Sequence, residues 1–123
     1  MGGMTAGIVF IVGRDWKFRA LLRAELVEKG FEAMELESLD EAGRLLASGA
    51  LPRLTVFDMT EFDAARNLAR LLALAKSGRL LLLISPGMAL PQELCAATTM
   101  VRPVAIGPIV EEIGRRLSGT VLT

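Results

Sequence analysis

Short apolar runs alternate along this chain with longer segments in which apolar residues recur at helical spacing. Uninterrupted runs of β-branched residues and leucine are typical of strands that are buried on both faces of a parallel sheet. In residues 31–36 apolar and acidic residues alternate instead, which favours a strand nearer the edge of the sheet. The predicted strands are residues 8–12, 31–36, 54–57, 80–84 and 99–101.

The segments between these runs predict amphipathic helices, because their apolar residues recur every three or four positions. The predicted inward stripes are Phe18, Leu21, Leu22 and Leu26, then Ala42, Leu45 and Leu46, then Leu68, Leu71, Leu72 and Ala75, and finally Ile109, Val110, Ile113 and Leu117. Arg19 is assigned to a polar face of the first helix. Only a short, weakly patterned helix is expected over residues 91–97.

Capping residues, proline and glycine mark the helix ends. Ser38 and Glu41 have the spacing of a capping box, and Thr60 or Asp63 is expected to cap the helix after the third strand. Pro108 is placed at the first position of the last helix, where proline is favoured. The predicted stops are Gly30, Gly49, Gly78 and Gly119.

The resulting order of elements, βαβαβαβαβα over residues 8–119, predicts a single α/β domain. Its architecture should be a doubly wound five-stranded parallel sheet, (βα)5, with helices on both faces. Residues 1–7 are rich in glycine, lack the basic start of a secretory signal and are expected to form a flexible N-terminal segment. With 52% hydrophobic residues, a chain of 123 residues can bury one sizeable core.

Composition narrows the possible chemistry. The 14 basic and 14 acidic residues balance, which argues against a general nucleic-acid binder. The chain has no histidine, which excludes Ser–His and Cys–His nucleophile pairs and the commonest metal ligand. The single cysteine, Cys95, allows no internal disulfide and is expected to be a small buried hydrophobe. The lack of an internal disulfide predicts a cytoplasmic protein, and no apolar run is long enough for a membrane span.

Distinctive side chains follow four of the predicted strands. Gly13-Arg14-Asp15 follows the first strand, Asp58 the third, Ser85 the fourth and Arg102 the fifth. Ligands of such sheets bind at the carboxyl ends of the strands, so these residues are the predicted functional site. Trp16 is predicted to be exposed, where it either anchors a partner or packs at the start of a helix.

Four stretches in this order resemble the receiver domain of two-component response regulators, which has a flavodoxin-like fold. They are Ile11-Val12-Gly13-Arg14-Asp15 with Arg19, Pro52-Arg53-Leu54-Thr55-Val56-Phe57-Asp58, Leu83-Ile84-Ser85 and Val101-Arg102-Pro103. The resemblance covers residues 8–117, nearly the whole chain. In that family an acidic pair and an aspartate hold Mg²⁺, the aspartate accepts a phosphoryl group, and a Ser or Thr and a Lys bind that group.

Carried over by position, the resemblance makes the phosphoacceptor equivalent Asp58, the phosphate-binding equivalents Ser85 and Arg102, and the switch equivalent Thr99. Arg102 replaces the lysine of the family, and Thr99 replaces an aromatic ring. Gly13 and Arg14 stand in place of the acidic pair, so the acidic site is degenerate. Mg²⁺ requires oxygen ligands, which neither residue's side chain supplies. Asp15 lies one residue beyond and would reach the site only if the loop shifted.

The leading hypothesis is therefore a pseudo-receiver, a signal-transduction protein without enzymatic activity, metal or cofactor. It would bind a histidine kinase or an output protein, with no nucleic acid or membrane involved, and homodimerisation is left open. By resemblance, the contact area lies around the fourth helix, fifth strand and fifth helix. Asp58 is expected to pair with Arg102 or Arg14, since guanidinium groups bind carboxylates well.

Three alternatives remain. The first is a phosphorylatable receiver that uses Asp58, Ser85 and Arg102, with Mg²⁺ bound through Asp15 or with no metal. The second is a flavodoxin-like cofactor binder, which is disfavoured because the chain has no tyrosine and a single tryptophan for stacking on a flavin. The third is nucleotide binding, which neither a G-x-G-x-x-G nor a Walker sequence supports.

Overall fold

The computed structural model describes residues 8–50, 52–59, 68–77, 79–94, 97–102 and 105–119. Within these ranges five parallel strands form one sheet in the order β2-β1-β3-β4-β5. The strands are β1 (Ile8–Val12), β2 (Glu32–Leu36), β3 (Leu54–Asp58), β4 (Arg79–Ile84) and β5 (Thr98–Val101). Every predicted strand is confirmed to within about one residue at each end, and the alternating run is an edge strand as expected.

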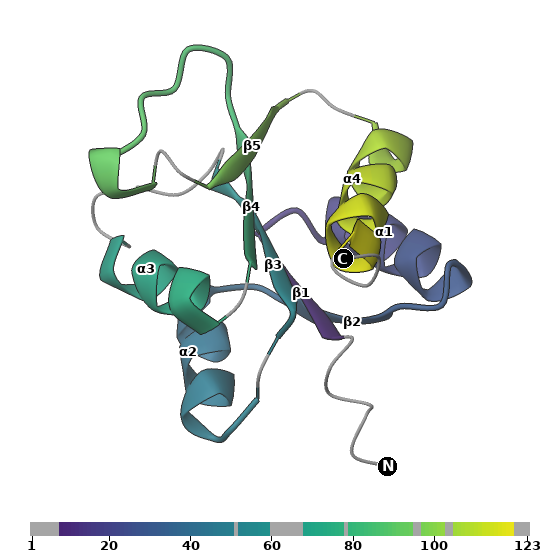
Figure 1. The fold of residues 1–123 in the computed structure, drawn as a ribbon, viewed down its shortest axis with the longest axis horizontal. Coiled ribbons are helices and arrows are strands. Elements are labelled where there is room, and N and C mark those ends of the chain that lie inside the picture. Colours follow the sequence, from purple (N-terminus) through teal and green to yellow (C-terminus); the bar gives the residue numbers. More distant parts are fainter. Residues whose placement is uncertain are drawn as a thin grey trace.

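Helices cover both faces of this sheet. They are α1 (Trp16–Glu28), α2 (Leu39–Ala47), α3 (Leu68–Ser77) and α4 (Ile106–Gly119), with the 3-10 helix η3 (Gln92–Leu94) between β4 and β5. In Figure 1 the sheet is seen nearly edge-on, with α1 and α4 on one side and α2 and α3 on the other. The predicted doubly wound α/β fold is confirmed. Between β4 and β5, where a short helix was predicted, the described residues form only the 3-10 helix η3.

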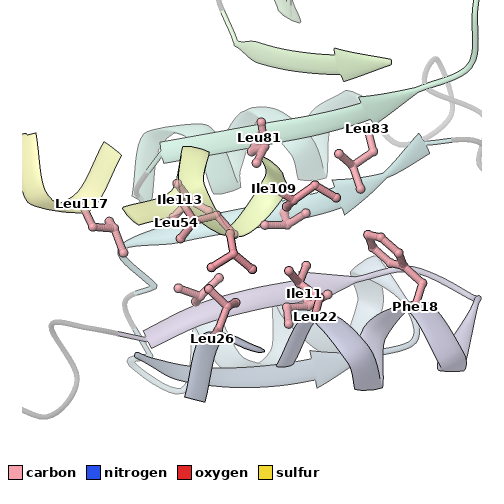
Figure 2. Packing of buried hydrophobic residues seen from close by; sticks show 13 residues of the cluster. Ile11, Phe18, Leu22, Leu26, Leu54, Leu81, Leu83, Ile109, Ile113 and Leu117 are labelled. Atoms are coloured by element: carbon pink, nitrogen blue, oxygen red, sulfur yellow. The ribbon is translucent and has the colours of Figure 1, made fainter. Parts of the chain in front are cut away.

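Each face of the sheet has its own hydrophobic cluster. Figure 2 shows the cluster of the α1–α4 face, where side chains of both helices meet over β1, β3 and β4. Its labelled members are Ile11, Phe18, Leu22, Leu26, Leu54, Leu81, Leu83, Ile109, Ile113 and Leu117. The opposite cluster includes Phe10, Phe57 and Leu82. Because strand side chains alternate between faces, β1, β3 and β4 contribute to both clusters, which is why their sequences are continuously apolar.

Two predictions for α1 are wrong. Leu21 is 59% exposed although it was assigned to the inward stripe, and Arg19 is only 6% exposed although it was assigned to a polar face. The buried arc of α1 is centred near Leu22, and neighbouring residues in a helix are separated by about 100°. The arc is extended towards β2, where the Arg19 guanidinium lies 3.4 Å from the carboxylate of Glu35. Burial on that side therefore depends on a charge partner supplied by another element.

Smaller corrections apply to the last two α-helices. In α3 the predicted Leu71 is buried, but Leu74 is buried in place of Ala75, which is exposed. Helix α4 begins at Ile106, two residues before Pro108. Proline is tolerated there because the N–H groups of a first helical turn have no intrahelical acceptor. The predicted end at Gly119 is confirmed.

The predicted capping of α2 is confirmed. The Ser38 hydroxyl accepts a hydrogen bond from the Glu41 N–H at 3.3 Å, and the Glu41 carboxylate accepts one from the Glu37 N–H at 2.7 Å. Gly30 and Gly49, beyond α1 and α2, have φ values of +94° and +104°, a region that favours glycine. The predictions for Thr60, Asp63, Gly78 and Cys95 lie outside the described residues. In the described part of the chain, no helix is both long and apolar enough for a membrane span.

Candidate functional site

The parallel sheet brings the predicted site residues to one edge, at the carboxyl ends of its strands. Asp58 is the last residue of β3, Gly13 directly follows β1, and Ser85 and Arg102 directly follow β4 and β5. The strand pairing places Val12 beside Phe57, Asp58 beside Leu83 and Ile84 beside Val101, so the four strand ends are nearly level. The sheet therefore brings residues as far apart in sequence as 13 and 102 to the same edge.

Asp58 and Arg102 form an ion pair at the centre of this edge. The Arg102 Nη1 atom lies 2.6 Å from Asp58 Oδ2, and the side chains of Arg102 and Asp58 are 26% and 7% exposed. Backbone and ring contacts fix the arginine, since its N–H donates to the Ile84 carbonyl at 2.8 Å and its guanidinium lies 4.7 Å from the centre of the Phe18 ring. Of the two arginines proposed as partners for Asp58, Arg102 is confirmed.

Gly13 lies directly against Asp58. A Cβ atom at position 13 would lie 3.2 Å from the Cβ of Asp58, which is tighter than an ordinary van der Waals contact. The Gly13 N–H donates to the Leu36 carbonyl at 3.1 Å, and the Gly13 carbonyl accepts a hydrogen bond from the Arg19 guanidinium. Position 13 therefore lies against the predicted phosphoacceptor without contributing a side-chain ligand. The buried Arg19 fixes the loop after β1 through the Gly13 carbonyl.

Arg19 is a site residue whose position was misassigned from the sequence. Its side chain is 8% exposed and lies 3.4 Å from the Glu35 carboxylate and 4.0 Å from the Glu37 carboxylate. These contacts connect α1, the loop after β1 and β2, so Arg19 positions the loop that begins at Gly13. Its place in α1, between the buried Phe18 and Leu22, was the available signal, because a residue within such an arc tends to be buried.

Asp15 is engaged as the N-cap of α1. Its Oδ1 atom accepts hydrogen bonds from the Lys17 N–H at 3.1 Å and the Phe18 N–H at 3.2 Å. This arrangement satisfies two N–H groups that have no acceptor within the helix. The loop shift that would bring Asp15 to Asp58 would require both bonds to break.

The residues at this edge do not fit a magnesium site. Mg²⁺ needs oxygen ligands at octahedral positions, usually with one or two protein carboxylates among them. Here Gly13 supplies no side-chain oxygen, Asp15 caps a helix and one oxygen of Asp58 is bonded to a guanidinium. Among the described residues, no group of three or more His, Cys, Asp or Glu side chains is arranged to hold a metal ion.

Arg14 lies at the rim of this edge and is exposed. Together with Glu37, Ser38, Glu41 and Arg44 it lines an open hollow of about 580 Å³ between the loop after β1 and the start of α2. The lining contains two cations and two anions, and Glu41 and Ser38 already bond to each other in the cap of α2. The hollow thus has no net formal charge to select an ion of one sign.

Ser85 and Thr99 occupy the positions predicted for them, and their roles stay predictions. Ser85 is half-buried, and its carbonyl accepts from the Met88 N–H at 3.0 Å in a turn where Gly87 has a φ of +77°. Thr99 is exposed on β5, beside Leu82 of β4. Trp16 is 63% exposed, which confirms the prediction of its exposure.

Glu112, on α4, is a buried charged residue that the sequence reading missed. It is 9% exposed and pairs with the guanidinium groups of Arg115 and Arg116, with Arg116 Nε 2.7 Å from its carboxylate. The spacing of three and four residues between these charges was a usable signal, since such pairs are neighbours on a helix. Both ion pairs lie within α4, so the cluster stabilises that helix.

No family model matches this chain, and a search of curated proteins finds no match. Solved structures do match. A receiver domain protein (CheY-like) from Methanospirillum hungatei JF-1 aligns with a TM-score of 0.75 at 15% identity, covering 96% of this chain and 99% of that one. The signal receiver domain of a putative Luxo repressor protein from Vibrio parahaemolyticus aligns with a TM-score of 0.75 at 13% identity, covering 94% and 93%.

A third match lies inside an enzyme. The lysine decarboxylase LdcF of Francisella novicida aligns with a TM-score of 0.68 at 16% identity, covering 93% of this chain but 17% of that one. At these identities the alignments establish the fold and leave residue roles open. Together with the strand order and the level strand ends, they show that this chain has the receiver-domain fold of response regulators.

Proposed function

We propose that this protein is a pseudo-receiver, a signalling module that acts by binding another protein and does not undergo metal-dependent phosphorylation. One observation carries the proposal, the 2.6 Å ion pair between Arg102 and Asp58 at the position where a receiver would bind metal and phosphate. The receiver fold supports a role in signal transduction.

Arg102 supplies a permanent positive charge to Asp58. Phosphoryl transfer depends on positioning and on metal ions that neutralise the developing charge. In this chain the guanidinium neutralises the carboxylate, and its planar fork and the Phe18 ring fix its orientation. A carboxylate held in this way is a weaker nucleophile, because one of its oxygens is engaged in a charge-assisted hydrogen bond.

The same ion pair joins β3 to β5, and β5 is the sheet edge through which we propose that the protein binds its partner. Val101 is 51% exposed and Thr99 is also exposed on this edge strand. An edge strand offers backbone hydrogen-bonding groups to another chain. We therefore propose that Arg102 holds β5 in one binding-competent position, and that a cytoplasmic histidine kinase or output protein is the partner.

The fold also occurs within a protein that is not named as a regulator. The Francisella novicida lysine decarboxylase contains a matching segment that makes up 17% of its chain. This occurrence shows that the fold is also found as one part of a longer chain. It supports no enzymatic activity for the present chain.

Intact-mass measurement tests the proposal directly. The protein is incubated with Mg²⁺ and a small-molecule phosphodonor such as acetyl phosphate, in parallel with an Asp58→Asn variant. We expect no added phosphoryl group in either sample. A mass gain in the wild-type protein that is lost in Asp58→Asn would favour the alternative, a phosphorylatable receiver. That alternative draws on the meeting of Asp58, Ser85 and Arg102 at one edge.

Partner binding provides a second test. A Val101→Asp substitution places a charge on the exposed face of β5, whereas Met34→Asp, 39% exposed on the opposite edge strand, is the matched control. With histidine kinases and output proteins of the same organism as candidate partners, we expect Val101→Asp to abolish binding and Met34→Asp to retain it. Equal loss in both variants would argue against the β5 edge as the contact surface.

A further inference from the structure

Helix α1 presents an apolar face to solvent. Of the five large hydrophobic side chains that are exposed in the described part of the chain, three lie on α1: Trp16 at 63%, Leu21 at 59% and Val27 at 49%. A helix that packs on a sheet normally has a polar outer side. The core covers only the inner side of this helix, so folding leaves the apolar side chains on its outer side exposed to water.

The outer residues form an ordered stripe. Trp16, Ala20, Ala24 and Val27 follow one another at intervals of four, four and three residues, which places them along one side of a helix. The stripe is about 16 Å long at a rise of about 1.5 Å per residue. Large side chains stand at its two ends and alanines at its centre, where Ala24 is exposed. Small central residues allow a second helix to approach closely.

We propose that the outer face of α1, consisting of Trp16, Ala20, Ala24 and Val27, binds the same face of a second copy of this chain, with the two helices antiparallel. In this arrangement a two-fold axis passes between Ala20 and Ala24. Trp16 of one copy then packs near Val27 of the other, so large groups meet beyond the ends of the alanine contact. Such an interface is self-complementary, as two-fold symmetry requires.

The charges on this face select the antiparallel orientation. Lys17 and Glu28 are both exposed and lie on the same outer side of α1, eleven residues apart. An antiparallel pair brings Lys17 of each copy to Glu28 of the other, and the two helix dipoles oppose each other favourably. In a parallel two-fold pair the same flank of the two helices lies on opposite sides of the contact, so Lys17 of one copy does not meet Glu28 of the other. The Lys17–Glu28 pairs therefore form only in the antiparallel arrangement.

The size of the face sets the expected affinity. One pair of short helices buries less than the roughly 1,200–2,000 Å² of a stable interface. We therefore expect a reversible dimer with a dissociation constant of roughly 10–100 µM, weakened by salt because its ion pairs are exposed. This inference does not depend on Asp58 or on the proposed partner, because it concerns the outer side of α1.

Sedimentation velocity over about 1–500 µM, at low salt, measures the association. Trp16 is the only tryptophan in the chain, so its emission reports on the same contact and should shift to shorter wavelength as the dimer forms. An Ala24→Glu variant places two carboxylates at the two-fold axis and should remain monomeric throughout. Ala47→Glu, an exposed alanine of α2, is the matched control and should dimerise like the wild type.

Charge reversal separates the contact from any folding defect. Lys17→Glu and Glu28→Lys should each weaken self-association about tenfold, since each replaces two attractive pairs by two repulsive ones. A one-to-one mixture of the two variants should recover a dimer of wild-type strength, because opposite charges meet again at both pairs. A monomer at every concentration, or an Ala24→Glu variant that dimerises normally, would overturn the proposal. So would a mixture that associates no better than the single variants.

Discussion

Removing the guanidinium of Arg102 isolates the interaction on which the site depends. We consider Arg102→Met, which retains an apolar stem beside Phe18 but removes the charge from the 2.6 Å pair with Asp58. The Asp58 side chain is 7% exposed, so its carboxylate is left in a poorly hydrated place without this partner. Unpaired buried charge is one of the larger sources of destabilisation by a single substitution.

The magnitude follows from the burial of the two groups. Opposite charges about 4 Å apart attract by about 4 kcal/mol at an effective dielectric constant of roughly 20. Arg102 is 26% exposed, so solvent screens part of this attraction, and desolvation of Asp58 offsets another part. We expect Arg102→Met to lower the free energy of unfolding by about 2–3 kcal/mol, including about 0.5–1 kcal/mol from the lost contact with the Phe18 ring.

Urea denaturation of a double-mutant cycle gives the measurement. Asp58→Asn alone should lower the free energy of unfolding by only about 1–2 kcal/mol, because the unpaired Arg102 side chain can turn to solvent. The double variant Arg102→Met/Asp58→Asn should be more stable than the sum of the single effects by about 1–2 kcal/mol. Arg44→Met, on an exposed residue of α2, is the control and should change stability by less than about 0.5 kcal/mol. Single effects that add to within about 0.5 kcal/mol would refute the reasoning, since they would show no coupling between the charges.

Three further predictions concern the core and the acidic site. Leu22→Ala removes a fully buried side chain and should lower the free energy of unfolding, measured by urea denaturation, by about 2–5 kcal/mol. Leu21→Ala, on the exposed neighbour, should lower it by less than about 1 kcal/mol. Similar losses in the two variants would contradict the burial of α1. The Thr55 hydroxyl is buried, and the described residues offer it no hydrogen-bond partner. Thr55→Val should therefore raise the unfolding free energy by about 1 kcal/mol in urea denaturation, and a decrease would reveal a partner. Gly13→Asp combined with Arg14→Asp introduces carboxylates at both positions of the acidic pair, the first of them against Asp58. Calorimetry should detect Mg²⁺ binding to this variant and none to the wild type, and equal results for the two proteins would contradict the assignment of the acidic site.

The sequence determined the elements and their chemistry. Apolar runs such as residues 80–84 predict strands buried on both faces, because they have no polar side to expose and are too short for a typical helix. The capping pair Ser38 and Glu41 and the stop at Gly30 are local signals, satisfied by hydrogen bonds or dihedral angles within a few residues. The site residues Asp58 and Arg102 were predicted for a similar reason, since both follow strands whose ends a parallel sheet must bring together.

The tertiary structure decided which residues become neighbours and which are buried. The strand order β2-β1-β3-β4-β5, the choice of Arg102 as a partner for Asp58 and the burial of Arg19 against Glu35 all join residues that are distant in the chain. Periodicity gives the direction of a side chain relative to its own helix and says nothing of the neighbour it meets. Leu21 was therefore assigned to the inward stripe although its side chain is exposed. For the same reason the balanced charge of the chain gave no sign of the exposed apolar residues on α1. Local propensity fixes the segments, whereas burial and pairing depend on how the connections cross the sheet.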